Sequence, residues 1–150
     1  MTLTNKTYLI TGASGNVGRA IARTFSQVGA NLALVDMNTD ALNALISEIG
    51  GDSARFKPYT ADLGNPEAVD MLLSQIESDF GKLDGLVHTV GGFAMGDPVH
   101  AGKLDVFDRM MTLNARIVYL LAGKVASFMI SKGVNGSISI MLARSGCKGA

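Results

Sequence analysis

Three glycines at three-residue spacing, Gly12, Gly15 and Gly18, follow a run of strand-forming residues and stand where a helical pattern begins. The first glycine permits a tight turn with positive φ, because the residue has no Cβ. The second lets the backbone approach a pyrophosphate, and the third lets the helix pack against the strand. The N–H groups and the positive end of that helix attract phosphate oxygens. The spacing therefore predicts a phosphate-binding turn that holds a dinucleotide.

A carboxylate follows this turn at the distance expected for ribose recognition. Asp36 ends the predicted strand 31–35, eighteen residues after Gly18. In dinucleotide folds an acid about 20 residues beyond the turn accepts hydrogen bonds from the adenosine ribose hydroxyls. Its charge would repel a 2′-phosphate, and the next residues, Met37 and Asn38, are not basic. The sequence therefore predicts NAD rather than NADP; the alternative is an Asp that is solvated in a turn.

Alternating strand and helix patterns position these residues. We predict strands over residues 7–10, 31–35, 54–59, 83–88 and 137–142, and helices over residues 16–28, 40–49, 66–80 and 104–131. The alternation predicts an α/β fold of Rossmann type, a doubly wound parallel sheet with five strands in the order 3-2-1-4-5. Pro58 indicates that the third strand lies at an edge or ends there. Ligand is expected at the carboxyl ends of strands one and four, where the winding direction reverses.

The composition fits a single globular domain, residues 1–150, and argues against several classes of protein. Hydrophobic residues make up 47% and charged residues 17% of the chain, which fits a large core. The formal net charge of zero gives no sign of a nucleic-acid surface. Lys124 interrupts the most apolar stretch, 117–130, so we expect no membrane span. A single cysteine, Cys147, and an N-terminus without an apolar signal segment predict a reducing, cytoplasmic location.

The stretch 11–18, TGASGNVG, resembles the TGxxxGxG turn of the short-chain dehydrogenases/reductases. Asn16 stands where that family has its middle glycine, and the stretch also reads as the TGxxGxxG form of longer members. We expect Asn16 to preserve the turn, because asparagine tolerates left-handed backbone geometry. Asp62 and Leu63 resemble the family's Asp-hydrophobic pair that holds the adenine. The alternative is an Asp that merely ends a strand.

The resemblance runs from about Lys6 to the last residues and implies an NAD-dependent oxidoreductase of a small carbonyl or alcohol substrate. It implies that the cofactor is bound by Gly12, Ser14, Gly15, Asn16, Val17, Gly18, Asp36, Met37, Asp62, Leu63, His88, Val90 and Gly91. The residues HTVG at 88–91 stand where the family has NNAG, and only Gly91 matches. We interpret His88 as structural or as lining the cofactor edge, rather than as a catalytic base.

Asn114 is the candidate catalytic residue that the resemblance identifies. The helical pattern places apolar residues with it on one face, which we expect to pack on the sheet: Phe107, Met110, Met111, Val118, Leu121, Val125 and Phe128. A buried Asn needs hydrogen-bond partners or costs about 1–3 kcal/mol. The family places an Asn in this helix that holds a water of the proton relay, and Asn114 matches it. The alternative is an Asn bonded to a nearby backbone group.

The usual proton donor of the family is missing from these 150 residues. Ala143 aligns with the Ser that orients the substrate, Ser145 lies two residues later, and some relatives such as dihydropteridine reductases also lack that Ser. The YxxxK motif is absent, since Lys124 follows Tyr119 at the wrong spacing. In the family the Lys lowers the pKa of the Tyr, which protonates the oxyanion left by hydride transfer. We therefore expect a chain truncated before this pair. The alternatives are a non-catalytic NAD(P)-binding or sensor module complete at 150 residues, and a Rossmann domain for another nucleotide-linked ligand.

The outer face of the long helix suggests self-association. It carries small and apolar residues, Tyr119, Gly123, Ala126 and Ile130, with Arg116 and Ser127 beside them. The family pairs its subunits through this helix, so we predict a homodimer or homotetramer. The remaining predictions are a small-molecule substrate, no nucleic-acid or membrane partner, and no metal site.

Overall fold

The computed structural model describes residues 2–94 and 97–142. Its described residues form one parallel sheet of five strands, which are β1 (Thr7–Thr11), β2 (Asn31–Asp36), β3 (Phe56–Thr60), β4 (Gly85–His88) and β5 (Ser137–Ile140). Their order is β3-β2-β1-β4-β5, which confirms the predicted topology. β3 lies at an edge of the sheet, as the proline at position 58 indicated.

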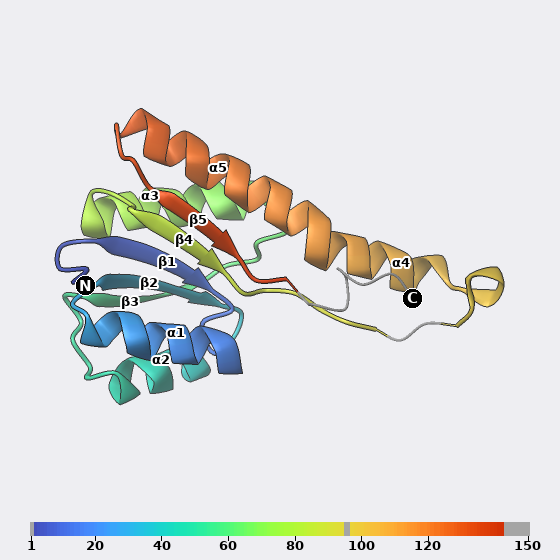
Figure 1. Ribbon diagram of the computed structural model, residues 1–150, viewed down its shortest axis with the longest axis horizontal. Helices are drawn as coiled ribbons and strands as arrows, with labels where there is room; N and C mark the ends of the chain where they lie inside the picture. Colours follow the sequence, from blue (N-terminus) through green and yellow to red (C-terminus); the bar gives the residue numbers. More distant parts are fainter. Residues whose placement is uncertain (1, 95–96, 143–150) are drawn as a thin grey trace.

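Helices cover both faces of the sheet (Figure 1). The α-helices are α1 (Asn16–Gln27), α2 (Thr39–Glu48), α3 (Pro66–Phe80), α4 (Leu104–Met111) and α5 (Ile117–Ser131). A π-helix, Thr112–Arg116, joins α4 to α5, and a short 3₁₀-helix, Val99–Ala101, precedes α4. α1 and α2 lie on one face, and α3 and α5 lie on the other. The predicted helix over residues 104–131 is therefore one helical run with a widened turn inside it.

Local chemistry explains where the helices begin and end. The side chain of Asn65 accepts hydrogen bonds from the backbone N–H groups of Glu67 and Ala68, and Pro66 occupies the first turn of α3. Gly81, in the left-handed region with φ of 73°, ends that helix. These capping signals set where α3 begins and ends, and β4, the next strand along the chain, pairs with β1.

Each face of the sheet has its own apolar core. On one face Leu9 and Leu86 pack with α3 and α5, whose Ile76 and Leu121 are fully buried. On the other face strand residues pack with α1 and α2, among them the fully buried Leu42. Strands covered on both faces have nearly continuous apolar sequences, which is why β1 and β2 were readable from sequence.

The long helix differs from the prediction. The stripe that packs on the sheet is Ile117, Leu121, Val125 and Met129, all buried and four residues apart. The expectation that the whole 104–131 face packs on the sheet is wrong, because α4 projects beyond the strands (Figure 1) and Phe107 is 58% exposed.

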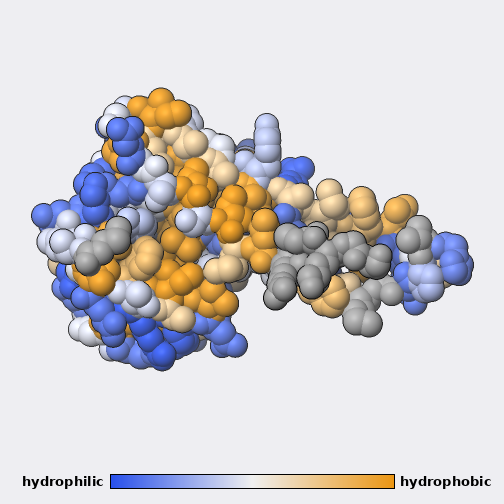
Figure 2. All heavy atoms as spheres, in the orientation of Figure 1, coloured by the Kyte–Doolittle hydropathy of each residue, from blue (hydrophilic) through white to orange (hydrophobic). Residues whose placement is uncertain are grey.

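β5 is covered less than the other strands. All four of its residues are exposed among the described residues. Figure 2 shows apolar residues gathered across the middle of the molecule, in the area that Figure 1 gives to β4 and β5. Ile138 and Ile140 of β5 and the following Met141 and Leu142 contribute to this exposed apolar surface.

The run Leu104–Ser131 is long and apolar enough to cross a bilayer, judged by length and composition. Core helices of soluble proteins pass the same test, and the buried stripe of α5 packs as a core helix does. The finding is therefore weak support for a membrane span, and the absence of one stays a prediction.

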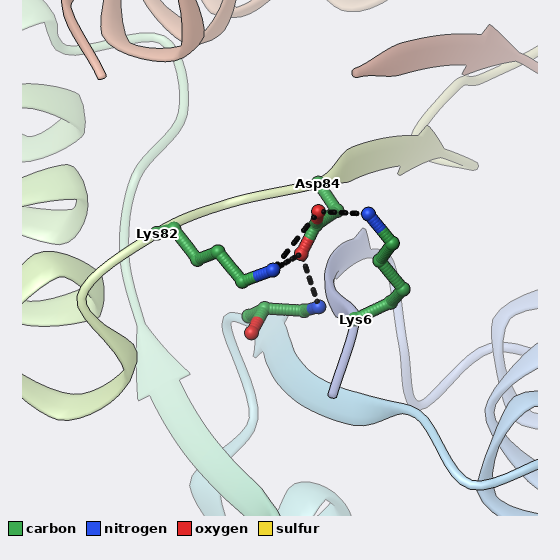
Figure 3. A network of polar contacts seen from close by, with 4 residues as sticks. Lys6, Lys82 and Asp84 are labelled. Atoms are coloured by element: carbon green, nitrogen blue, oxygen red, sulfur yellow. Dashed lines mark hydrogen bonds and ion pairs between the residues drawn. The ribbon is translucent and has the colours of Figure 1, made fainter. Parts of the chain in front are cut away.

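An ion cluster lies where β1 and β4 begin (Figure 3). Asp84 is 6% exposed, and its Oδ1 lies 2.8 Å from Nζ of Lys6. Its Oδ2 lies 3.1 Å from Nζ of Lys82 and accepts a hydrogen bond from the Thr7 N–H at 2.9 Å. Burial opposes ionisation of Asp84, but the hydrogen bonds from Lys6, Thr7 and Lys82 outweigh it and lower its pKa below the ordinary value. The cluster fastens the two strands together across 78 residues of sequence.

Candidate functional site

A cleft of about 660 Å³ opens at the carboxyl ends of the first four strands, toward which their arrowheads point in Figure 1. It is lined by Gly12, Ser14, Gly15, Asn16, Val17, Gly18, Val35, Asp36, Met37, Ala61, Asp62, Leu63, Thr89, Val90, Gly91, Leu113 and Ile117. Every residue predicted to bind the cofactor, except His88, lies on its wall. The structure thus brings together segments that follow β1, β2, β3 and β4, at the place where the winding direction reverses.

The glycine turn needs two of its three glycines for steric reasons. Gly12 has φ of 65°, a conformation that side chains rarely adopt. A Cβ on Gly18 would lie 2.2 Å from the carbonyl oxygen of Gly12, so the close approach of α1 to the turn excludes any side chain there. Gly15 has φ of −71°, and an added Cβ would meet the same oxygen at 3.3 Å. Asn16 is helical rather than left-handed. The expectation that Asn16 preserves the turn by adopting left-handed geometry is therefore wrong.

The N-terminus of α1 offers donors to the cleft. Gly15 is its N-cap and has no side chain to accept a hydrogen bond from the first turn. The backbone N–H groups of Asn16, Val17 and Gly18 have no acceptor inside the helix, as in the first turn of any α-helix. All three residues line the cleft. Among the described residues the helix end therefore presents unpaired N–H groups and a positive dipole to whatever occupies the cleft, which suits an anion.

Asp36 lies on the neighbouring wall, at the end of β2. Its Oδ2 accepts hydrogen bonds from the Ser14 N–H at 3.0 Å and the Ser14 hydroxyl at 2.6 Å, and its Oδ1 accepts one from the Met37 N–H at 2.8 Å. Burial favours the neutral acid, but these bonds outweigh it and lower the pKa of Asp36 below its ordinary value. The cleft thus contains an ionised carboxylate opposite a helix N-terminus.

Asp62 forms a local turn after β3, in which its Oδ1 accepts a hydrogen bond from the Gly64 N–H at 2.9 Å. Asp62 is exposed and the neighbouring Leu63 is buried, and both line the cleft. Both interpretations of Asp62, as part of an adenine site and as the end of a strand, are compatible with this geometry.

His88 lies behind the cleft rather than on its wall. The side chain is 1% exposed, and its Nδ1 lies 2.7 Å from the hydroxyl oxygen of Thr11. Its Nε2 has no hydrogen-bond partner among the described residues. Burial lowers the pKa of His88, which favours the neutral imidazole. Of the two interpretations of His88, structural or lining the cofactor edge, this placement favours the structural one, and cofactor contact by His88 stays a prediction.

Thr89, which the sequence did not predict as a site residue, lines the cleft directly after β4. Its hydroxyl donates to the carbonyl oxygen of Thr11 at 2.8 Å. It thereby connects the end of β4 to the residue that precedes the glycine turn. Its position next to the predicted residues at 90 and 91 was the available signal, since strand-end residues converge at this edge of a parallel sheet.

Asn114 is exposed, so the prediction that it is buried among apolar side chains is wrong. Its Oδ1 accepts a hydrogen bond from the Gly92 N–H at 3.0 Å, and its Nδ2 donates to the carbonyl oxygens of Gly92 at 2.9 Å and Met110 at 3.0 Å. The alternative, an Asn bonded to nearby backbone, describes this geometry. Asn114 lies within the π-helix Thr112–Arg116, a kind of distortion that is frequent at functional sites. Its catalytic role stays a prediction.

The two residues considered for substrate orientation, Ala143 and Ser145, lie outside the described residues. The described part of the site therefore consists of the glycine turn, the carboxylate at the end of β2 and the segments that follow β3 and β4.

Comparison with known proteins identifies relatives over nearly the whole chain. The profile of a family described as short chain dehydrogenase matches residues 6–149. The 2,5-dichloro-2,5-cyclohexadiene-1,4-diol dehydrogenase of Sphingobium indicum is 32% identical, over 91% of this chain and 53% of that protein. The D-threitol dehydrogenase of Mycolicibacterium smegmatis is 28% identical, over 87% of this chain and 50% of that protein.

A solved structure described as NAD⁺-bound xylitol dehydrogenase resembles this chain over the full length of this chain. It matches with a TM-score of 0.91 and 30% identity, and the match covers all of this chain and 57% of the other. The chain spans about half the length of the curated relatives it matches.

Proposed function

This chain belongs to the short chain dehydrogenase family, and from that premise we propose that it forms the nucleotide-binding part of an NAD-dependent oxidoreductase. The observation that carries the proposal is the uncapped N-terminus of α1, which opens into the cleft beside an ionised carboxylate. A dinucleotide offers both a pyrophosphate for the N–H groups and ribose hydroxyls for the carboxylate.

The residues of the cleft fit a nicotinamide dinucleotide. Gly18 leaves no space for a side chain between α1 and the turn, so the backbone donors of the first turn come close to the cleft. The N–H groups of Asn16 and Val17 would bind the pyrophosphate, and Asp36 would accept hydrogen bonds from the adenosine ribose. Asp62 and Leu63 would border the adenine, and Val90 and Gly91 would support the nicotinamide half. When bound, the cofactor supplies the hydride, while the protein supplies position and exclusion of water.

NAD is the proposed form of the cofactor, because Asp36 is ionised and the two residues that follow it are not basic. Titration calorimetry of the purified chain with NAD and NADP tests the proposal. We expect NAD to bind the more tightly. Equal or tighter binding of NADP would contradict the preference, and the binding of neither would contradict the proposed function itself.

The substrate is proposed to be a small alcohol or carbonyl compound, and the 150 residues alone are proposed to bind cofactor without useful turnover. They contain no Tyr-x-x-x-Lys pair to supply the proton. General acid catalysis is worth about 10²–10⁴-fold, and lost substrate positioning adds to this. A reductase assay of the mass-verified chain with NADH and a carbonyl panel should therefore give near-background rates. Clear turnover after repurification would show that another residue donates the proton.

Self-association through α5 and a cytoplasmic location complete the proposal. Tyr119 is 86% and Ile130 is 77% exposed on the side of α5 that faces away from the sheet. A homodimer or homotetramer would cover this surface. Sedimentation at micromolar concentration should show more than a monomer, and a monomer alone would count against the assembly.

A further inference from the structure

The contact between Ser14 and Asp36 joins the glycine turn to the end of β2. The two residues are 22 positions apart in sequence, and two hydrogen bonds connect them, one from the Ser14 N–H and one from its hydroxyl. Both bonds reach the same carboxylate oxygen, Oδ2. The hydroxyl bond, at 2.6 Å, has the short length of a bond to an ionised acceptor.

These contacts fix the carboxylate without neutralising it. Oδ2 is held by Ser14 and Oδ1 by the Met37 N–H, so the group is anchored at both oxygens. Among the described ion pairs, none includes Asp36, whereas the nearby helix cations Arg19 and Arg23 pair with Glu48. Asp36 therefore presents a full negative charge in a fixed orientation on the wall of the cleft.

We propose that Ser14 is a positioning residue for cofactor specificity, which acts through Asp36 to favour an unphosphorylated ribose over a 2′-phosphate. The inference rests on the proposed function and deepens it, since it assigns the preference for NAD to a pair of residues rather than to the carboxylate alone. Ser14 thereby gains a role distinct from direct contact with the nucleotide.

The loss of the hydroxyl has a predictable physical effect. The pKa of Asp36 is lowered overall, although burial alone would raise it. The Ser14 hydroxyl makes the largest contribution to the lowering, followed by the N–H groups of Ser14, Met37 and Asn38. Without the hydroxyl, the carboxylate loses its shortest hydrogen bond and becomes easier to protonate. A neutral or misoriented acid accepts the ribose hydroxyls less well and repels a phosphate less.

The test compares Ser14→Ala, Ser14→Thr, Asp36→Asn and the double variant Ser14→Ala/Asp36→Asn by calorimetry with NAD and NADP from pH 7 to pH 4. We expect Ser14→Ala to reduce the NAD:NADP affinity ratio about tenfold, in the range of a lost hydrogen bond to a charged group. Ser14→Thr, which keeps the hydroxyl, should restore most of the ratio. In the Asp36→Asn background, the alanine substitution should have no further effect.

The pH profile provides a readout that a merely structural role would not move. In Ser14→Ala the fall in NAD affinity on acidification should begin at a higher pH than in the wild type, because Asp36 protonates earlier. Carboxyl NMR of the nucleotide-free protein should show the same upward shift of the Asp36 titration, which needs no binding measurement.

Three results would overturn the inference. An unchanged affinity ratio and Asp36 titration in Ser14→Ala would leave the serine without influence on specificity. An undiminished effect of the alanine in the Asp36→Asn background would show that Ser14 contacts the nucleotide directly. A wild-type chain that binds neither nucleotide would overturn the proposed function together with this inference, and that result is distinguishable from the other two.

Discussion

Two aspartates lie at opposite ends of the same sheet, and both have a lowered pKa for the same physical reason. Asp84, where β4 begins, and Asp36, where β2 ends, are each held ionised by hydrogen bonds that outweigh burial. They differ in what surrounds the charge. Asp84 is paired with Lys6 and Lys82 and is almost wholly buried, whereas Asp36 has no cation partner among the described residues and lines a cleft.

The difference shows that a perturbed carboxylate is not by itself a functional group. Where β1 and β4 begin, Lys6 and Lys82 neutralise the charge of Asp84. The cluster links β1 to β4, and the Asp84 carboxylate needs no further partner. At the carboxyl ends a charge and N–H groups of α1 that have no partner among the described residues both face the cleft, so water or a ligand must satisfy them. The open end is therefore the candidate site, and the closed end is structural.

The strongest way to break the open end is to fill the space between α1 and the turn. Gly18→Ala places a Cβ 2.2 Å from the Gly12 carbonyl oxygen, so we expect a loss of about 3 kcal/mol in the free energy of unfolding, together with loss of NAD binding. Gly15→Ala is the matched control, because its Cβ meets that oxygen at 3.3 Å. Urea unfolding and calorimetry should separate the two variants, and equal stability would contradict the steric argument.

Removal of the open carboxylate should change binding rather than stability. We expect Asp36→Ala to weaken NAD about thirtyfold, the range of a lost hydrogen bond to a charged group, and to weaken NADP less. Titration calorimetry with both nucleotides measures this. A parallel loss for NAD and NADP would mean that Asp36 does not read the ribose.

Removal of the Asp84 carboxylate should change stability rather than binding. Asp84→Asn should lower the free energy of unfolding by about 1–2 kcal/mol, because the Thr7 N–H and two lysines lose an ionised acceptor. The wild-type contribution is present above the unfolded Asp pKa of about 3.9 and is lost as pH falls through the lower folded pKa. Urea unfolding from pH 7 to pH 3 should thus show a weaker acid dependence in the variant. A change in NAD affinity in Asp84→Asn would contradict the purely structural role of Asp84.

His88 sharpens the comparison, since it is a buried titratable group whose Nε2 lacks a partner in the part of the chain that the structure describes. Burial lowers its folded pKa, so its neutral form is favoured: stability is full above the unfolded pKa of about 6.5 and falls as pH drops. We expect His88→Asn to reduce the stability loss between pH 6.5 and pH 5.5, by about 1 kcal/mol at most. Identical unfolding curves for both proteins over this range would contradict the assignment.

The sequence predicted the sheet and its order because each element carries its own local signal. Once the strand order is known, the residues after β1 and β2 are also expected to converge on one cleft, because parallel strands bring their carboxyl ends together. The contact between Lys6 and Asp84 gave no such signal, because the two residues are 78 positions apart in sequence. Such contacts depend on strand register, which local patterns do not contain.

The long helix shows another limit of sequence patterns. Its extent was predictable, but periodicity says which residues share a face and not whether anything lies opposite that face. Phe107 is therefore exposed where the pattern suggested burial, and Asn114 uses its amide on the Gly92 backbone. The buried stripe begins only after the π-helix, because α4 and the π-helix contain no buried residues, and no apolar pattern predicted this.

The strand order has a kinetic consequence for the cleft, whose walls close over very different lengths of chain. The Ser14–Asp36 contact joins residues 22 apart, whereas Thr11 and His88, where the other wall begins, are 77 apart. Closing the longer loop costs about 1 kcal/mol more chain entropy. We therefore expect the β1–β2 pair, with the serine and its carboxylate, to form ahead of the β1–β4 pair during folding. The wall with Asp36 would then be complete before the wall with Thr89 and Gly91.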